Sequence, residues 1–123
     1  MLTISKPQKN GFDVFISNKN FKCAFITTHK QYSYGKINFV KRHNDSDEIY
    51  VLLKGNATIL TSDDINQTFS KTVLSNHIAY NVKCGTWHHL AVSNDALIFV
   101  AESGAVSPEN TDTADISKKE IYI

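Results

Sequence analysis

Short runs rich in β-branched and aromatic residues recur along almost the whole chain, and no long helical pattern separates them. Clusters of Gly, Asn, Asp and Ser, such as HNDSD, KGN and SDDIN, lie between the runs. Evenly spaced strands with such breaks are typical of an all-β sandwich or barrel, and we expect fewer than about a tenth of the residues in helix. The expected strands are residues 12–16, 21–28, 32–41, 48–54, 56–61, 67–74, 77–82, 87–93 and 96–102.

A chain of 123 residues has the length of one domain. We expect a single domain over residues 1–123, with a core barrel at about 21–102. Lys54-Gly55-Asn56 and Asp63–Asn66 are expected to be tight connections on either side of a hairpin strand. The polar segment 103–123 is expected to be an irregular tail with one helical turn near 114–119 and a short edge strand at its end.

Charge and apolar patterning argue against several classes of protein. Thirteen basic residues balance twelve acidic ones, and the densest basic cluster is only Lys41-Arg42, so no nucleic-acid partner is expected. No apolar run approaches the roughly 20 residues that span a bilayer, and residues 1–15 do not resemble a signal peptide. Cys23 and Cys84 form no C-x-x-C motif. We therefore expect a cytoplasmic protein with two reduced thiols and no membrane partner.

Two segments carry the residues most suited to chemistry, 41–48 and 83–89. Alternate residues of a strand share one face. Lys41 and His43 should therefore lie on one face of their strand, and Glu48 and Tyr50 on one face of the next. His88 should face the opposite way from His89, for which we expect an outer, interface or supporting role. In a closed barrel the inward-facing members can converge on one cavity.

The first segment resembles the first sequence motif of the cupin superfamily. That motif has the form H-x-H, three or four residues, E, six residues, G. Glu48 and Gly55 match its second half, and His43 falls on its second histidine. Lys41 stands in place of the first histidine.

The second segment is similar to the second cupin motif, in which a glycine is followed two residues later by a histidine. Gly85 and His88 match these positions, whereas Lys83 replaces the usual proline and Val92 the final asparagine. The two-part resemblance implies a single-domain cupin jelly-roll, a double-stranded β-helix barrel. It also implies a homodimer, and the apolar segment 12–28 is the expected contact between the two copies.

Two functional interpretations of the site are open. In one, His43, Glu48 and His88 bind one divalent metal ion (Zn, Mn, Fe or Ni), a ligand set that leaves positions open for substrate. Metal-binding cupins usually have a further histidine where Lys41 stands, and a protonated lysine cannot coordinate an ion. In the other, no cofactor is present and the catalytic residues are Glu48, His88 and Lys41. Lys41 pairs with a carboxylate or carbonyl of a small ligand, and Glu48 and His88 transfer protons. A structural role without chemistry is the third alternative.

The substrate-binding residues that we expect are Lys41, Tyr50 and Trp87. A narrower similarity, to the ureidoglycolate lyase family, rests on Tyr80-Asn81-Val82, on residues 85–90 and on residues 108–112. It implies a C–N lyase that acts on a polar, carboxylate-bearing metabolite. The alternative is a non-catalytic cupin binding module for a sugar or small organic acid. Ionisable pairs within hydrogen-bond reach would favour the enzyme.

The carboxylate of Glu48 is central to either interpretation. We expect Glu48→Gln to change function far more than Glu102→Gln, because Glu102 lies just outside the two motifs.

Overall fold

Ten β-strands make up the fold in the computed structural model, which describes all 123 residues. The strands are β1 (Phe12–Ser17), β2 (Phe21–Ile26), β3 (Phe39–His43), β4 (Glu48–Lys54), β5 (Ala57–Ser62), β6 (Ser70–Val73), β7 (Ala79–Val82), β8 (Trp87–Val92), β9 (Leu97–Ser103) and β10 (Thr111–Asp115). The helical segments are three 3₁₀ turns of three residues each: Lys30–Tyr32, Pro108–Asn110 and Ser117–Lys119. The all-β prediction is confirmed. None of the helical turns has the length or apolar character that crossing a membrane requires.

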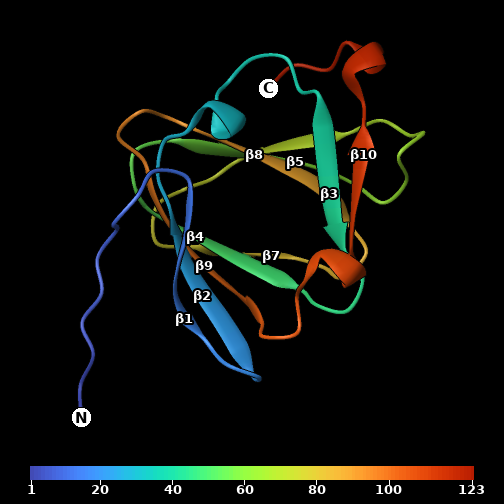
Figure 1. The fold of residues 1–123 in the computed structure, drawn as a ribbon. Helices are drawn as coiled ribbons and strands as arrows, with labels where there is room; N and C mark the ends of the chain where they lie inside the picture. The colour runs from blue at the N-terminus through green and yellow to red at the C-terminus, as the bar shows by residue number, and fades with distance from the viewer.

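The strands form two five-stranded antiparallel sheets that face each other (Figure 1). One sheet has the order β1-β2-β9-β4-β7 and the other β10-β3-β8-β5-β6. β4 and β9 are therefore neighbours in the first sheet, and β3 and β8 are neighbours in the second. These four strands carry the polar residues of the interior.

Alternating side chains from both sheets fill the space between them. On β4 the buried positions are Glu48, Tyr50 and Leu52, as period-two alternation predicts. The apolar members of this core are Ala24, Ile26, Tyr50, Leu52, Ala57, Ile59, Leu74, Val82, Leu90, Val92, Ala96, Ile98 and Val100. A second, smaller cluster contains Ile37, Val40, Leu60, Trp87 and Ile116.

Gly55, in the connection after β4, shows why this turn needs a glycine. Its φ is +80°, and an added Cβ would lie 2.7 Å from both the Ala96 Cα and the Ser93 Oγ. A side chain would therefore meet backbone from the connection before β9 as well as strain its own backbone. The tight connection expected at Lys54-Gly55-Asn56 is present, followed by the β5–β6 hairpin.

The strand expected over residues 32–41 is only partly correct. The chain forms a 3₁₀ turn at Lys30–Tyr32, and β3 begins only at Phe39. The intervening residues bond instead to the end of the chain: the Gly35 amide donates to the Ile123 carbonyl at 3.1 Å, and the Ile37 amide donates to the Ile121 carbonyl at 2.8 Å. Residues 35–37 therefore pair with the distant segment 121–123 and do not extend β3 towards its N-terminal end.

The expectation of an irregular tail over residues 103–123 is wrong for its central part. β10 pairs with β3, and Ile116 is buried in the second apolar cluster. The expected helical turn occurs at Ser117–Lys119, and Tyr122 forms an isolated bridge with Lys36 in the expected edge position. The segment Thr111–Asp115 is thus the edge strand of the second sheet next to β3.

Candidate active site and metal centre

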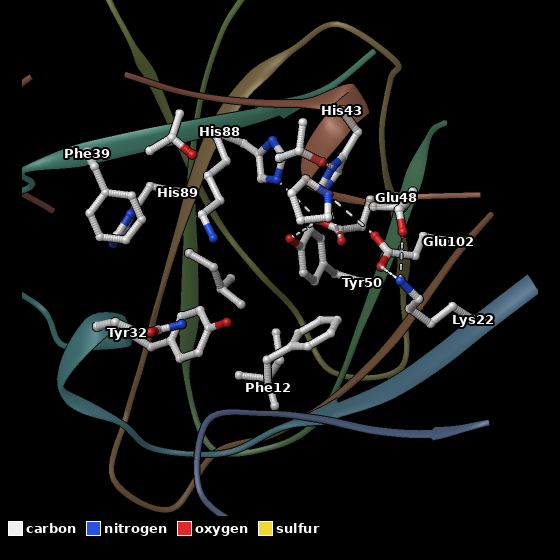
Figure 2. Close-up of a pocket in the computed structure, with 18 of the residues that line it drawn as sticks. Phe12, Lys22, Tyr32, Phe39, His43, Glu48, Tyr50, His88, His89 and Glu102 are labelled. Carbon is white, nitrogen blue, oxygen red and sulfur yellow. Dashed lines mark hydrogen bonds and ion pairs between the residues drawn. The ribbon is translucent and has the colours of Figure 1, made fainter. Parts of the chain in front are cut away.

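A cavity of about 540 Å³ lies between the two sheets. Lys41, His43, Glu48, Tyr50 and His88 all line it. Figure 2 shows the last four of them around the cavity. The structure thus brings together, in one place, residues from β3, β4 and β8 that are up to 47 positions apart in the chain.

Backbone contacts hold the two motif segments together beside the cavity. Lys41 on β3 is the register partner of His88 on β8. The amide of Gly85 donates to the His43 carbonyl at 2.8 Å. The carboxylate of Asp47 accepts from the Cys84 amide at 2.8 Å. These bonds hold the segment before β4 next to the segment before β8, and so bring His43 close to His88.

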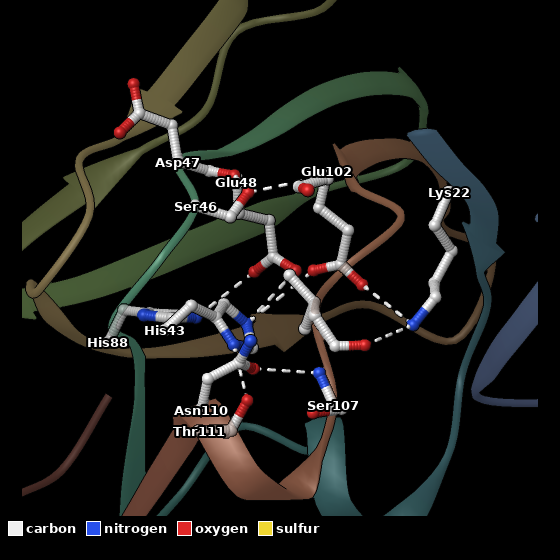
Figure 3. Close-up of polar contacts among 12 residues, drawn as sticks. Lys22, His43, Ser46, Asp47, Glu48, His88, Glu102, Ser107, Asn110 and Thr111 are labelled. Carbon is white, nitrogen blue, oxygen red and sulfur yellow. Dashed lines mark hydrogen bonds and ion pairs between the residues drawn. The ribbon is translucent and has the colours of Figure 1, made fainter. Parts of the chain in front are cut away.

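Each histidine is oriented by its Nδ1 atom. The Nδ1 of His88 lies 3.0 Å from the Thr86 carbonyl oxygen. Because a carbonyl only accepts, Nδ1–H is the donor; Nε2 offers a lone pair when the ring is neutral and donates to Glu48 when the ring is protonated. The Nδ1 of His43 lies 2.9 Å from the Thr111 Oγ1 on β10. Both Nε2 atoms then face the carboxylates in the cavity (Figure 3).

Glu48 lies at the centre of these contacts. Its Oε1 is 3.1 Å from His88 Nε2, and its Oε2 is 3.5 Å from His43 Nε2. The Tyr50 hydroxyl also donates to Glu48 Oε1. Burial alone would raise the pKa of the Glu48 carboxyl, but hydrogen bonds with His43 and His88 hold that pKa well below its ordinary value. Glu48 is therefore an ionised carboxylate.

Glu102 is a site residue that the sequence motifs missed. It is the register partner of Glu48 on the adjacent strand β9, is only 8% exposed and lines the same cavity. Our use of Glu102 as a comparison residue outside the site is therefore wrong. Burial and the neighbouring Glu48 carboxylate raise the pKa of Glu102 to about 8. Alternation along β9 could have identified Glu102 from the sequence, because Ile98, Val100 and Glu102 occupy successive inward-facing positions of this strand.

His43, Glu48 and His88 can hold a metal ion. One ligand atom from each lies within 4.8 Å of the others. Ligands about 2.1 Å from a tetrahedral or octahedral ion are themselves about 3.0–3.4 Å apart. The distances from Glu48 to the two Nε2 atoms, 3.1 and 3.5 Å, are close to that spacing. Two imidazole nitrogens with free lone pairs and one carboxylate form a suitable donor set.

Lys41 lines the cavity but does not pair with its carboxylates. Its Nζ lies 5.9 Å from the centroid of the Phe39 ring, and it forms no salt bridge. The ammonium is therefore free to bind an anionic group of a ligand.

Trp87 does not line the cavity, contrary to our expectation. It belongs to the second apolar cluster, and the Arg42 guanidinium lies 4.5 Å from the centroid of its ring. Adjacent residues of a strand face opposite ways, so His88 can point into the cavity only if Trp87 points out of it.

His89 lines the cavity wall as well, so the outer position expected for it is wrong, and its supporting role stays a prediction. Its ring meets Phe39 edge-on, with centroids 5.2 Å apart, and burial lowers its pKa. Phe12 and Tyr32 line the cavity from segments without a motif, and burial raises the pKa of Tyr32 to about 12.

Comparison with known proteins identifies the fold. No family model and no curated protein sequence matches the chain. A solved structure from Bacillus halodurans matches with a TM-score of 0.66 at 10% identity, over 82% of this chain and 75% of that one. A cupin-2 domain protein from Shewanella frigidimarina matches with a TM-score of 0.52 at 16% identity, over 76% of this chain and 79% of that one. The chain has the cupin fold.

A third match is a variant of Streptomyces PAC13 solved with uridine. Its TM-score is 0.63 at 12% identity, over 94% of this chain and 89% of that one. These matches and the two facing sheets confirm the jelly-roll cupin barrel that the two motifs implied.

Proposed function

We propose that this cupin barrel is an enzyme that binds one divalent metal ion and acts on a small carboxylate-bearing metabolite. The observation that carries the proposal is the convergence of His43, His88 and Glu48 in one cavity, with His88 Nε2 only 3.1 Å from the Glu48 carboxylate. Ionisable groups within hydrogen-bond reach are what proton transfer and metal binding need, whereas a plain binding pocket does not require them.

His43 Nε2, His88 Nε2 and the Glu48 carboxylate would hold the ion, with Zn, Mn, Fe and Ni as candidates. When bound, such an ion acts as a Lewis acid that binds and polarises oxygen atoms of a substrate. Thr86 and Thr111 hold the two imidazoles by their Nδ1 atoms, and the Tyr50 hydroxyl holds the carboxylate. Such supporting contacts keep ligands in position before the ion arrives.

Lys41 is the group best suited to bind the substrate's carboxylate. It is the cavity lysine without a carboxylate partner, and an ammonium serves well as a compact charge for an anion. The cavity volume of about 540 Å³ is in the range of small-molecule sites. The uridine in the Streptomyces structure shows that a barrel of this fold can hold a small polar molecule.

The reaction that we propose to test first is C–N cleavage of the ureidoglycolate lyase type. The substrate hydroxyl loses its proton as the carbonyl of glyoxylate forms. The C–N bond breaks, and the leaving urea nitrogen gains a proton. If no ion binds, the short contact between His88 and Glu48 favours a metal-free version in which these two residues exchange the protons with substrate.

The metal part of the proposal is tested on protein stripped with chelator. Calorimetric titration with Mn²⁺, Zn²⁺, Fe²⁺ and Ni²⁺, together with elemental analysis, should show one bound ion per chain. His88→Ala should weaken binding by at least about 100-fold, since it removes a ligand. His77→Asn is the matched control, because His77 is exposed and its φ of +64° suits asparagine. A wild-type protein that binds none of the four ions would overturn the metal site.

The enzymatic part is tested with glyoxylate as a binding probe and ureidoglycolate as a substrate. We expect glyoxylate to bind in calorimetry and ureidoglycolate to release urea at a rate that falls in His88→Ala. Binding of both compounds without any release of urea would show a binding module in place of an enzyme.

A further inference from the structure

Glu102 reaches the cavity from the strand next to Glu48. The two residues are register partners on β9 and β4, so their side chains leave neighbouring strands at the same level of the barrel. In Figure 3 both carboxylates lie close to the ring of His43. Glu102 is 92% buried, since only 8% of its surface is exposed.

The two oxygens of Glu102 have different surroundings. Oε1 lies 3.9 Å from the Lys22 ammonium, which also donates to the Val106 carbonyl at 2.9 Å. Oε2 is buried, has no hydrogen-bond partner and lies 3.7 Å from His43 Nε2. A buried polar atom left without a partner costs about 1–3 kcal/mol, so such an atom indicates a missing partner.

No lysine or arginine fills that place. Lys41 forms no salt bridge, and Lys22 lies on the opposite oxygen of Glu102. The neighbouring imidazole offers a nitrogen lone pair when neutral, and Glu48 adds a second carboxylate. A divalent cation is a partner that two glutamate oxygens and two imidazole lone pairs would share.

We propose that Glu102 is a fourth ligand of the metal ion, bound through Oε2, and that the centre therefore consists of two histidines and two glutamates. This inference rests on the proposed metal site and adds a ligand to it. Lys22 is a positioning residue: fixed by the Val106 carbonyl, it holds Oε1 and leaves Oε2 facing His43.

Calorimetric titration of metal-free protein with Mn²⁺ tests this ligand. Glu102→Gln keeps the shape of the side chain and removes its charge, and we expect it to weaken Mn²⁺ binding about 10–100-fold. Glu109→Gln is the matched control and should bind as the wild type does, because Glu109 is exposed and lies outside the cavity. Equal affinities for wild type and Glu102→Gln would overturn the inference.

A crystal structure of the Mn²⁺-loaded protein shows whether Glu102 coordinates the ion or only attracts it through its charge. We expect anomalous scattering to place the ion about 2.0–2.3 Å from Glu102 Oε2. An ion more than about 3 Å away would show that Glu102 is not a ligand, whatever the titration gives. If His88→Ala loses Mn²⁺ binding and Glu102→Gln does not, the metal site of His43, Glu48 and His88 stands and only the inference about Glu102 is overturned. A wild type that binds no ion would overturn both proposals.

Discussion

Trp87 and His88 are adjacent on β8, yet one packs in the second apolar cluster and the other lines the cavity. The same contrast separates Arg42, which lies against Trp87, from Lys41 and His43 on either side of it. In a strand, a shift of one position along the chain moves a side chain from one face of the sheet to the other. At the scale of residues, the chemistry of this barrel therefore depends on which of two neighbours faces inward.

Lys41 allows a test of substrate binding that leaves the metal ligands in place. Lys41→Met should weaken glyoxylate binding by about 10-fold or more, because a hydrogen bond to a charged group contributes about 1.5–3 kcal/mol. Mn²⁺ affinity should not fall, since Lys41 makes no ion pair with the site carboxylates. Calorimetric titration with each ligand measures both effects.

Lys71→Met, on the exposed strand β6, is the control for Lys41→Met. Glyoxylate binding at wild-type strength in Lys41→Met would contradict the role of Lys41 as the anion-binding group.

At the scale of elements, the turns decide where the inward-facing residues meet. The Gly55 connection joins β4 to β5, and so links a strand of the first sheet to a strand of the second. The Gly85 connection carries the chain into β8 and donates a hydrogen bond to His43. Both glycines have a positive φ, +80° and +82°. They differ in their surroundings, because a Cβ on Gly55 would overlap the connection before β9, whereas one on Gly85 would meet nothing within 4 Å.

Gly55→Ala and Gly85→Ala form a matched pair that separates backbone strain from steric overlap. Both alanines should pay the cost of a left-handed conformation, about 1–2 kcal/mol. Gly55→Ala should lower the free energy of unfolding further, because its Cβ would lie 2.7 Å from the Ala96 Cα. Urea denaturation monitored by tryptophan fluorescence measures the difference. Equal losses in the two variants would show that the Ser93–Ala96 connection moves aside at little cost.

At the scale of the whole molecule, the first sheet carries apolar side chains on its outer face as well as its inner one. Phe15 stacks on Phe25 with centroids 4.4 Å apart and lies 6.3 Å from Phe99. Val14 and Ile16 are also exposed on β1, whose outer edge has no partner strand. Exposed apolar strand edges are usually covered in native proteins.

We predict that a second copy of the chain covers this edge, as a two-fold homodimer that uses residues 12–28. Light scattering at micromolar concentration should give the mass of two chains. Ile16→Lys should shift the protein towards monomer, because it puts a charge into the contact without disturbing the core. Val73→Lys, at an exposed apolar position of the other sheet, should remain dimeric. A monomeric wild type, or a dimer that Ile16→Lys leaves unchanged, would contradict this contact.

Local pattern alone was enough to predict much of the barrel. The strands at 48–54 and 87–93 agree closely with β4 and β8, because alternation of buried and exposed residues is a property of consecutive positions. The same alternation placed Glu48 beside Tyr50 on one face, and the motif spacing selected His43 and His88. The part of the site on β3, β4 and β8 could therefore be predicted from the sequence.

Only the tertiary structure decided what surrounds those residues. Glu102 has no motif of its own and joins the site because β9 pairs with β4 in the register that sets Glu102 beside Glu48. Thr111 orients His43 because β10 pairs with β3 across 68 positions of the chain. Such register depends on the packing of whole sheets, which no local window of sequence contains. The sequence by itself determined which side chains could face inward, and the pairing of distant strands determined which of them meet.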